Sequence, residues 1–428
     1  MMDSVPMAMV PIPGSTRRPH TRRMLLSSLL CVLSLSGCSG RLELPQVVYL
    51  AIGVNADQSI DADLLGDFQE RLNGLESGYR QIHPNTRFQF SVYPDERIDD
   101  AVRRRTNAGL GPDLLFINGD TARYLLEQGL IDPFPANRAL ENLFSAYDLN
   151  RMRTASGQLA GLPIVVQPQV ACFNRQRLST PPSTLSELLK TSAKGHSIGL
   201  SVELNTLLWT AGSMGTIEAL NRAAAGTPPS AEERQQISKW LRWLQNASDQ
   251  QRVSFFGGQL ALQNEFGAGR LDWITCSSMS LPKLRKSLGQ ALGVASLPSG
   301  PGGLASPINR LRVMALGRSS SREGRQRALS FSRFSVNPLV QRSLTLGSQT
   351  LLPANRFVKV PIRSSRALQA MADSQEGGQQ VAPLIGLIPD DDPRLAAAQG
   401  LITQLVFGEI SPESAADAFI ALFQRRQR

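Results

Sequence analysis

Polar side chains suited to holding a hydroxyl-rich small molecule follow several apolar runs of this 428-residue chain. Asn55 comes shortly after the run at 47–52, and Asn118 and Asp120 follow the run at 114–117. Amide, carboxylate and guanidinium groups pair well with hydroxyl groups, and aromatic rings cover C–H faces. Open α/β sheets bind ligands at the carboxyl ends of their strands. The candidate ligand-binding residues are Asn55, Asn118, Asp120, Gln167, Gln169, Asn205, Trp209, Ser277, Ser278, Asn309 and Arg310.

Each of these candidates also has an ordinary structural interpretation. Asn, Asp and Ser side chains cap helices and turns in most proteins, so we expect about half of the candidates to contact a ligand. Trp209 fits a core position as well as a cleft position, whereas Trp240 and Trp243 are expected to pack between helices. Asp113 is expected to close a Gly-Pro-Asp turn. Because Arg310 could pair with an anionic group, a phosphorylated or carboxylated ligand is an alternative.

The elements that position these residues alternate between strand and helix. Apolar or alternating runs at 47–52, 88–92 and 114–117 have the length and pattern of strands. Apolar residues recur at helical spacing over 64–82, and a polar helix is expected to end near 105. This order predicts an α/β fold with a parallel, doubly wound sheet flanked by helices.

Composition and motifs argue against several classes of function. Only His83 and His196 lie beyond residue 37, and no Gly-x-Ser-x-Gly, His-Glu-x-x-His or clustered metal-ligand motif occurs. We therefore expect no catalytic residue, no metal and no cofactor. Carboxylate pairs need not be adjacent in sequence, so an exported carbohydrate-active enzyme stays open. The net charge of +10 comes from scattered arginines without a nucleic-acid-binding motif, so no nucleic-acid partner is expected.

The first 38 residues have the layout of an export signal. Four arginines within 17–23 precede an apolar run at 24–35, which small residues and Cys38 follow. A membrane span needs about twenty apolar residues, so this shorter run does not predict a transmembrane helix. The Leu-Ser-Gly-Cys sequence at 35–38 resembles the lipobox of bacterial lipoproteins, which implies cleavage before Cys38 and lipidation of its sulfur. Arg22 and Arg23 leave twin-arginine export open.

Two further cysteines, Cys172 and Cys276, lie in apolar, strand-like runs. A free buried cysteine behaves as a small apolar side chain, and we favour that interpretation for both residues. An exported protein also permits a disulfide, but the sequence alone does not give the Cα separation that a disulfide requires.

Several segments of the chain resemble the maltose-binding-protein-like solute-binding proteins of bacterial ABC importers (extracellular solute-binding protein family 1). The similar segments are Gly-Pro-Asp-Leu-Leu at 111–115, Leu-Leu-Glu-Gln-Gly-Leu-Ile-Asp-Pro at 125–133, and those at 156–163, 182–188, 266–278, 338–341 and 351–354. The chain departs from that family at three places. Cys172-Phe173-Asn174 replaces a Tyr-Tyr-Asn-like end of the first crossing, and Leu185 replaces a tryptophan. Ser278 with Met279 stands where a ligand-facing tryptophan is frequent.

The resemblance implies two lobes, each a mostly parallel sheet flanked by helices, joined by crossings near 162–169, 298–307 and 346–353. Residues 1–37 would be the signal peptide and 38–46 a lipidated tether. Lobe 1 would comprise 47–165 and 304–347, and lobe 2 would comprise 166–303 and 348–428.

The function implied by the resemblance is capture of a sugar, oligosaccharide or glycosidic osmolyte between the lobes. A monomer anchored in the cell envelope through Cys38, most simply in the periplasm, would deliver the solute to ABC permease subunits. An aromatic content of 6% favours a small or very polar solute, because few rings are available for stacking. An exported enzyme, a binder of anionic solutes and a structural lipoprotein are the alternatives.

Overall fold

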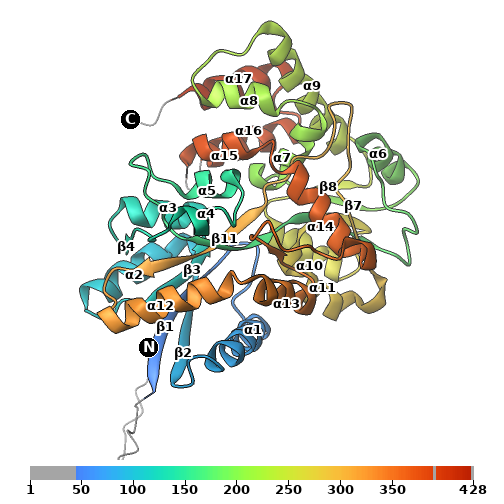
Figure 1. Ribbon diagram of the computed structural model, residues 1–428. Coiled ribbons are helices and arrows are strands. Elements are labelled where there is room, and N and C mark those ends of the chain that lie inside the picture. The colour runs from blue at the N-terminus through green and yellow to red at the C-terminus, as the bar shows by residue number, and fades with distance from the viewer. Residues whose placement is uncertain (1–44, 389–391, 426–428) are drawn as a thin grey trace, which may run out of the picture. The chain divides into compact units, whose positions relative to one another are not determined.

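The computed structural model describes residues 45–388 and 392–425, and the stretch from Pro45 onward forms one compact unit. The signal peptide, Cys38 and most of the expected tether lie outside the described residues. Within the described part, the strands form two separate mixed sheets, and helices pack around them (Figure 1). No helix there is long and apolar enough to cross a membrane.

The first sheet has the strand order β12-β5-β11-β3-β1-β2, with β4 paired to β11. Its strands are β1 (Gln46–Val54), β2 (Thr86–Pro94), β3 (Leu114–Asn118), β4 (Ile131–Asp132), β5 (Leu162–Gln167), β11 (Arg310–Gly317) and β12 (Leu352–Pro353). β1 runs parallel to both β2 and β3, as the alternation of strands and helices predicted. β11 runs antiparallel to β3 and β5, so this sheet is less parallel than expected.

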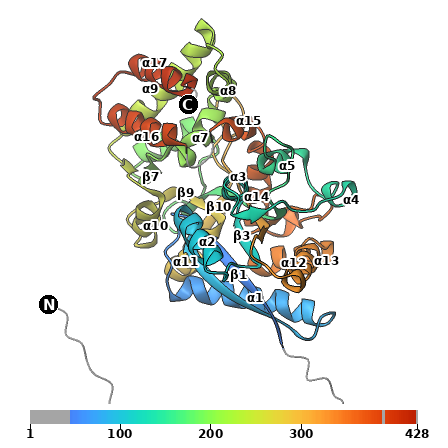
Figure 2. The same cartoon turned by 90° about the vertical axis from the view of Figure 1, so that its left-hand side faces the viewer.

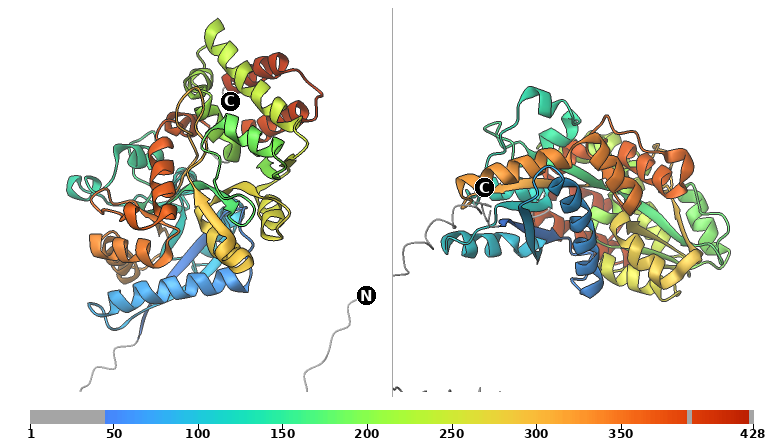
Figure 3. Two further views of the ribbon diagram at one scale, coloured as in Figure 1. Left: turned by 90° about the vertical axis from the view of Figure 1, so that its right-hand side faces the viewer. Right: turned by 60° about the horizontal axis from the view of Figure 1, so that its bottom comes forward.

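Helices cover both faces of the parallel strands, which explains why β1 is buried and apolar from Leu50 to Val54. The elements are α1 (Ala62–Arg80), η1 (Asp95–Arg97), α2 (Ile98–Asn107), α3 (Gly119–Glu127), α4 (Arg138–Glu141), α5 (Ala146–Met152), α12 (Arg322–Ser335) and α13 (Pro338–Ser348). Figure 3 shows α1 and α12 beside the strands. The ring of Phe331 in α12 lies 5.3 Å from that of Tyr79 in α1 and 4.2 Å from that of Phe88 in β2. These aromatic contacts fix both helices against the sheet.

The second sheet has the strand order β10-β6-β9-β7-β8. Its strands are β6 (Gln169–Asn174), β7 (Ile198–Ser201), β8 (Val253–Phe256), β9 (Trp273–Ser277) and β10 (Leu292–Ala295). β7 is parallel to β8 and β9, whereas β6 is antiparallel to β9 and β10. This sheet too is therefore only partly parallel.

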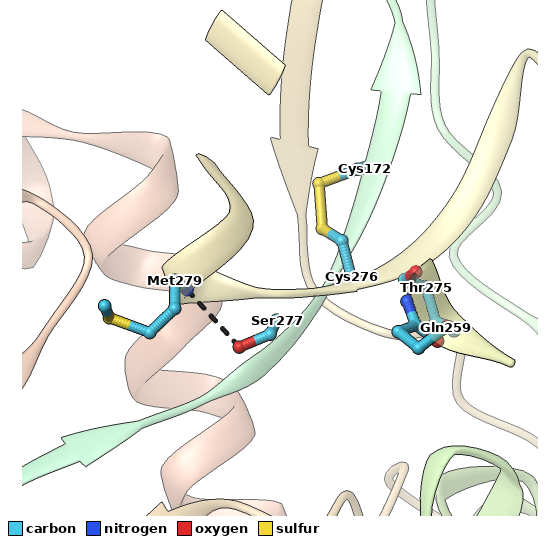
Figure 4. Close-up of a disulfide and its surroundings, with 6 residues drawn as sticks. All are labelled: Cys172, Gln259, Thr275, Cys276, Ser277 and Met279. Atoms are coloured by element: carbon cyan, nitrogen blue, oxygen red, sulfur yellow. Dashed lines mark hydrogen bonds between the residues drawn. A yellow bond between two sulfur atoms is a disulfide. The ribbon is translucent and has the colours of Figure 1, made fainter. Parts of the chain in front are cut away.

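A disulfide joins Cys172 of β6 to Cys276 of β9, with a Cα separation of 5.9 Å (Figure 4). The preference for two free cysteines was therefore wrong. Residue type and apolar surroundings do not distinguish the two states. The disulfide can form because β6 and β9 are neighbouring antiparallel strands whose register places the two cysteine side chains close together.

Helices gather on the second half of the molecule (Figure 2). They are α6 (Leu185–Ala193), α7 (Leu204–Ser213), α8 (Ile217–Ala224), α9 (Ala231–Ser248), α10 (Gln259–Gly267), η2 (Ser278–Ser280), α11 (Leu281–Leu288), η3 (Gly289–Ala291), η4 (Ile362–Ser364), α14 (Arg366–Gly377), α15 (Ala382–Leu387), α16 (Pro393–Val406) and α17 (Pro412–Gln424). Trp240 of α9 is fully buried, donates a hydrogen bond to Thr210 of α7 at 2.8 Å and packs edge-on against Phe419 of α17. Trp240 therefore packs between helices, as predicted, and Trp243 lies at the same interface, half-buried.

The chain passes between the two sheets at three places. Pro168 alone separates β5 from β6, and residues 296–309 connect β10 to β11. The third passage differs from the expectation, because β12 still pairs with β5 in the first sheet. The chain returns to the second sheet only with α14, which packs against β6 and β10. This passage therefore lies between 354 and 365, beyond the expected 346–353.

The second passage is held tightly against α14. A Cβ atom on Gly377 would lie 2.2 Å from the carbonyl oxygen of Ala305, so only glycine permits this approach. The Asn309 side chain donates to the carbonyl of Ser374 at 2.7 Å and accepts from the Ser374 hydroxyl at 2.9 Å. These contacts fix the position at which β11 begins, and with it Arg310.

Candidate functional site

A cleft with a volume of 640 Å³ lies between the two sheets, and residues that follow strands of each sheet line it. It is lined by Asn55, Ala56, Asp57, Asp95, Glu96, Asp99, Asn118, Asp120, Thr121, Tyr124, Glu203, Leu204, Asn205, Thr206, Arg310, Asp392, Pro393, Leu395, Ala396 and Gln399. A small pocket of 30 Å³ adjoins it and shares four of these residues. The small pocket is lined by Asp57, Gln167, Gln169, Asn205, Thr206, Gln259, Ser277, Ile308 and Arg310.

On the side of the first sheet, the amides at the strand ends are hydrogen-bonded to one another. Asn118 donates to the Asn55 side chain at 2.7 Å, and Asn55 donates to Gln167 at 3.3 Å. Arg312 of β11 donates to the oxygen of Asn118 at 2.9 Å. The ends of β1, β3, β5 and β11 are therefore linked by side chains in which each amide oxygen accepts a hydrogen bond.

Arg312 is the centre of this network and is only 1% exposed. It also contacts the Asp95 carboxylate at 3.2 Å and the backbone oxygens of Gly53 at 2.5 Å and Phe116 at 2.8 Å. Burial lowers the pKa of the Arg312 guanidinium, an effect that Asp95 opposes. Burial also raises the pKa of Asp95, which the positive charges of Arg312 and Arg310 oppose. Arg312 therefore connects the strand ends that form this wall of the cleft, and loss of its charge would leave the buried Asp95 without its partner.

Two further aspartates that line the cleft are paired with arginines. Asp57 contacts Arg310 at 3.0 Å, and Asp120 contacts Arg151 at 3.0 Å. Arg151 also donates to the backbone oxygen of Asn309 at 2.8 Å. Burial lowers the pKa of the Arg151 guanidinium, but Asp120, Tyr147 and Asp148 together raise it by more, so the net shift is upward. These pairs hold carboxylates at the cleft surface.

On the side of the second sheet, two glutamine side chains are held in one orientation by the hydrogen bonds that their NH2 groups donate. Gln169 donates through Nε2 to the backbone oxygen of Thr206 at 2.9 Å, and Gln259 donates to that of Thr275 at 2.5 Å. Figure 4 shows Gln259 beside Thr275, at the strand that leads to Ser277. Among the described residues, neither Oε1 atom has a hydrogen-bond partner. Each amide therefore leaves its oxygen for another group.

Glu203 lies at the start of α7, where it lines the cleft. Its carboxylate accepts a hydrogen bond from the backbone of Gln259 at 3.3 Å, and no ion pair to it occurs in the described part of the chain. Burial raises the pKa of Glu203, which the Gln259 hydrogen bond and the charge of Arg310 oppose. Glu203 is thus a partly desolvated carboxylate without a countercharge in direct contact.

Eight of the eleven candidate residues line the cleft or the small pocket. They are Asn55, Asn118, Asp120, Gln167, Gln169, Asn205, Ser277 and Arg310. Their contact with a solute stays a prediction, because lining a cleft is not binding. Ser277 also accepts a hydrogen bond from the backbone of Met279 at 3.3 Å (Figure 4).

The other three candidates lie in the protein interior. Trp209 is fully buried with its ring 6.2 Å from that of Trp273, which places it in the core. Ser278 is fully buried and donates to the backbone oxygen of Thr350 at 2.6 Å. Asn309 accepts from the backbone of Gln169 at 3.2 Å in addition to its bonds to α14. These three side chains hold elements together and do not line the cleft.

Several residues that line the cleft were missed from the sequence. Asp57 lies two residues beyond Asn55, and Glu203 follows β7 as Asn55 follows β1, so the rule about strand ends could have found both. Gln259 starts α10, and no local signal marks it. Tyr124 is the aromatic residue among the described residues that line the cleft.

The cleft is acidic although the protein is basic. Its lining includes seven carboxylates and one guanidinium among the described residues. The carboxylates are Asp57, Asp95, Glu96, Asp99, Asp120, Glu203 and Asp392. Within residues 45–388 and 392–425 they do not gather into a group that could hold a metal ion. The cleft therefore attracts hydrogen-bond donors and positive charge.

A family model described as bacterial extracellular solute-binding protein matches residues 78–361. The chain belongs to this family. The match includes most residues that line the cleft of this solute-binding protein, and the family name places its members outside the cytoplasm. No curated protein sequence matches the chain significantly.

Solved structures share the fold of this solute-binding protein at low sequence identity. The GacH receptor of Streptomyces glaucescens, solved unliganded and with acarbose, is 16% identical with a TM-score of 0.69, over 90% of this chain and 100% of that one. The maltose-maltodextrin binding protein of Alicyclobacillus acidocaldarius is 17% identical with a TM-score of 0.63, over 89% and 100%. The maltose-binding periplasmic protein of Listeria monocytogenes, in complex with maltose, is 15% identical with a TM-score of 0.65, over 89% and 97%. These matches identify the two-lobed fold.

Proposed function

We propose that this solute-binding protein captures a sugar, a short oligosaccharide or a glycosidic osmolyte and delivers it to the permease subunits of an ABC importer. The observation that carries the proposal is the 640 Å³ cleft lined by amide, hydroxyl and carboxylate groups from both halves of the molecule. Clefts of this size suit small polar ligands, and their polar groups match sugar hydroxyls. The solved structures with maltose or acarbose bound have the same fold and support the solute class.

In the proposed mechanism, the solute bridges residues carried by the two sheets. Asn118 and Asp120 contribute from the first side, and Glu203 and Asn205 contribute from the second. A solute that contacts both sides binds the closed form more tightly than the open form and shifts the equilibrium by that difference. The closed form then docks on the permease, while ATP hydrolysis in the cytoplasm powers transport. The binding protein itself catalyses no reaction.

Anchoring is part of the same proposal. Cleavage before Cys38 and lipidation of its sulfur would hold the protein at a membrane surface in the cell envelope. Residues 38–46 would serve as the tether to β1, and the protein would act as a monomer. The net positive charge that arginines give the mature chain would attract it to anionic lipid headgroups near the anchor.

An anionic solute and an enzymatic role both fit the cleft less well. Seven carboxylates in the lining disfavour a phosphorylated or carboxylated solute by like-charge repulsion. Asp95 and Asp120 are held by buried arginines and Asp57 by Arg310, an arrangement that suits fixed hydrogen-bond acceptors better than groups that exchange protons during catalysis.

A thermal-shift screen of the chain beginning at residue 39 tests the proposal. The panel contains sugars, glycosides, polyols and their phosphates. A ligand that binds only the folded form raises the melting temperature, so we expect a shift with one sugar or glycoside and recovery of that compound unchanged by mass spectrometry. A shift with phosphates alone, or conversion of a ligand into a product, would contradict the proposal.

A variant at the cleft sharpens this test. Gln169→Ala removes an amide that lines the small pocket, so we expect the affinity for the identified solute to fall about fivefold or more. Gln235→Ala on the exposed face of α9 makes the same chemical change away from the cleft and should leave the affinity unchanged. Equal affinities in both variants, measured by calorimetry, would remove Gln169 from the site.

A further inference from the structure

Three residues that line the small pocket beside the cleft carry a buried oxygen atom without a hydrogen-bond partner. Asp57 Oδ1, Gln169 Oε1 and Gln259 Oε1 lack a hydrogen-bond partner among the described residues. The three residues are 5%, 8% and 4% exposed. A buried acceptor left unpaired costs free energy, so the pocket is complete only when a donor occupies it.

The orientation of these groups is fixed by the bonds that they already make. The NH2 groups of Gln169 and Gln259 donate to backbone oxygens, so neither amide can rotate to offer a donor without losing that bond. The other oxygen of Asp57 is held by Arg310 at 3.0 Å. The unpaired atoms are therefore all acceptors, contributed by both sides of the cleft.

The electrostatic surroundings of the pocket are negative. Asp57 and Glu203 lie close enough to Arg310 for their charges to interact, so two carboxylates surround one guanidinium. The adjoining cleft adds Asp120, Glu96 and Asp99. Arg151 neutralises Asp120, whereas Glu96 and Asp99 make no ion pair within the described chain. An occupant of the pocket therefore experiences a negative potential.

We propose that this small pocket holds the primary ammonium group of the solute. An ammonium group carries three hydrogens, no acceptor and one positive charge, which matches three unpaired acceptors in negative surroundings. A volume of 30 Å³ admits a group about the size of a water molecule. The inference rests on the proposed function and narrows its solute class to amino sugars and glycosides that carry an unsubstituted amine.

Other occupants leave part of the pocket unsatisfied. A hydroxyl group donates one hydrogen and a water molecule two, so each leaves at least one acceptor unpaired. A phosphate dianion donates none and would face the Asp57 carboxylate. An N-acetylated amine carries no charge and donates one hydrogen, so it leaves two acceptors unpaired.

Calorimetry with matched ligands tests the inference on the chain beginning at residue 39. The probes are D-glucosamine with D-glucose, and the β-1,4-linked glucosamine disaccharide with cellobiose and with its N,N′-diacetylated form. We expect an amine to bind about tenfold or more tightly than its neutral partners, because hydrogen bonds to charged groups exceed neutral ones. The preference should shrink in high salt.

Two variants connect this preference to the pocket. Asp57→Asn and Glu203→Gln each remove a negative charge and keep the side-chain shape, so the preference for the amine should fall about fivefold or more. Asp417→Asn and Glu265→Gln make the same changes at carboxylates outside the cleft and should preserve it. Glu203→Gln keeps the test informative if Asp57→Asn disturbs folding through Arg310, and melting temperatures report such disturbance.

The possible results separate this inference from the proposed function. Binding of neutral sugars at equal or higher affinity than amines overturns the ammonium pocket and leaves sugar capture standing. Failure of every amine to bind overturns the inference as well. An amine preference that both pocket variants retain places the ammonium elsewhere and also overturns it.

Discussion

The two sheets meet at one cleft but are stabilised there by different means. The first sheet uses Arg312, a buried guanidinium that links β1, β3 and β11 and the Asp95 carboxylate. The second sheet uses a disulfide between β6 and β9. The side-chain amides near the cleft differ accordingly in their hydrogen bonding. Those of Asn55 and Asn118 are bonded within the first network, whereas the oxygens of Gln169 and Gln259 are left unpaired.

This comparison teaches that polarity at a cleft does not by itself indicate solute binding. On the first side, polar groups largely maintain the sheet, and a solute meets side chains that are already fixed. On the second side, a covalent bond supports the strands, and the amide oxygens of Gln169 and Gln259 have no hydrogen-bond partner among the described residues. We therefore expect changes on the first side to reduce stability and affinity together, and changes to the disulfide to reduce stability alone.

The largest effect is expected for Arg312→Met, which keeps much of the side-chain volume but removes the charge. The change leaves the buried Asp95 and two backbone oxygens without their partner, so the free energy of unfolding should fall by about 3–5 kcal/mol. Urea denaturation measures this loss. Arg242→Met breaks an exposed ion pair with Glu413 and should have little effect on the free energy of unfolding. A similar small loss in both variants would refute the role of Arg312.

An intermediate effect is expected when both disulfide cysteines are replaced by alanine. The Cys172→Ala, Cys276→Ala double variant should lose about 2–4 kcal/mol of unfolding free energy, because the cross-link no longer restricts the unfolded chain. Solute affinity should stay the same, since neither residue lines the cleft or the small pocket. Loss of affinity in a variant that is still folded would contradict the division of roles between the two sheets.

The smallest effect is expected for Glu203→Gln, and its sign depends on pH. Because burial raises the pKa of Glu203, the charged carboxylate destabilises the folded state above that pKa. The variant should be more stable than the natural protein at pH 7, by less than about 1 kcal/mol because the site is partly exposed. The difference should shrink as pH falls and vanish well below the pKa of an ordinary glutamate, where both folded and unfolded chains are protonated.

Glu265→Gln provides a control with the opposite sign. The hydrogen bond from Arg270 lowers the pKa of Glu265, so its charge favours folding at neutral pH and the contribution is lost as pH falls through the folded-state pKa. Melting temperatures followed from below the folded-state pKa of Glu265 up to pH 7 should therefore diverge from those of the natural protein in opposite directions for the two variants. Parallel behaviour would show that the Glu203 carboxylate is not desolvated as described.

The fold was accessible from the sequence because its signals are local. The apolar run at 47–52 and the helical spacing over 64–82 correspond to β1 and α1. Asn55 and Asn118 were found by the same reasoning, since a polar residue after a buried strand reaches the edge of the sheet. The direction of the antiparallel strand β11 depends on where the chain returns from the second sheet, which no local pattern states.

The rest of the site depends on partners that are distant in sequence. Ser278 is buried because Thr350 supplies its acceptor, and Asn309 is fixed by Ser374. Gln259 faces the pocket because Thr275 orients its amide. A serine or glutamine has the same local signal whether it packs inside or faces a ligand. Only the folded contacts distinguish these cases.

Gln167 and Gln169 flank Pro168, the single residue at which the chain passes from one sheet to the other. If the two halves rotate about this pivot, contacts that a solute makes there persist in every rotational state. Such contacts raise the overall affinity but do not shift the balance between states. Asp99 of α2 and Gln399 of α16 line the cleft from opposite halves. A solute can contact both residues only when the two halves are closed around it. Tightness of capture and readiness to dock on a transporter are thus controlled by different residues and can be altered independently.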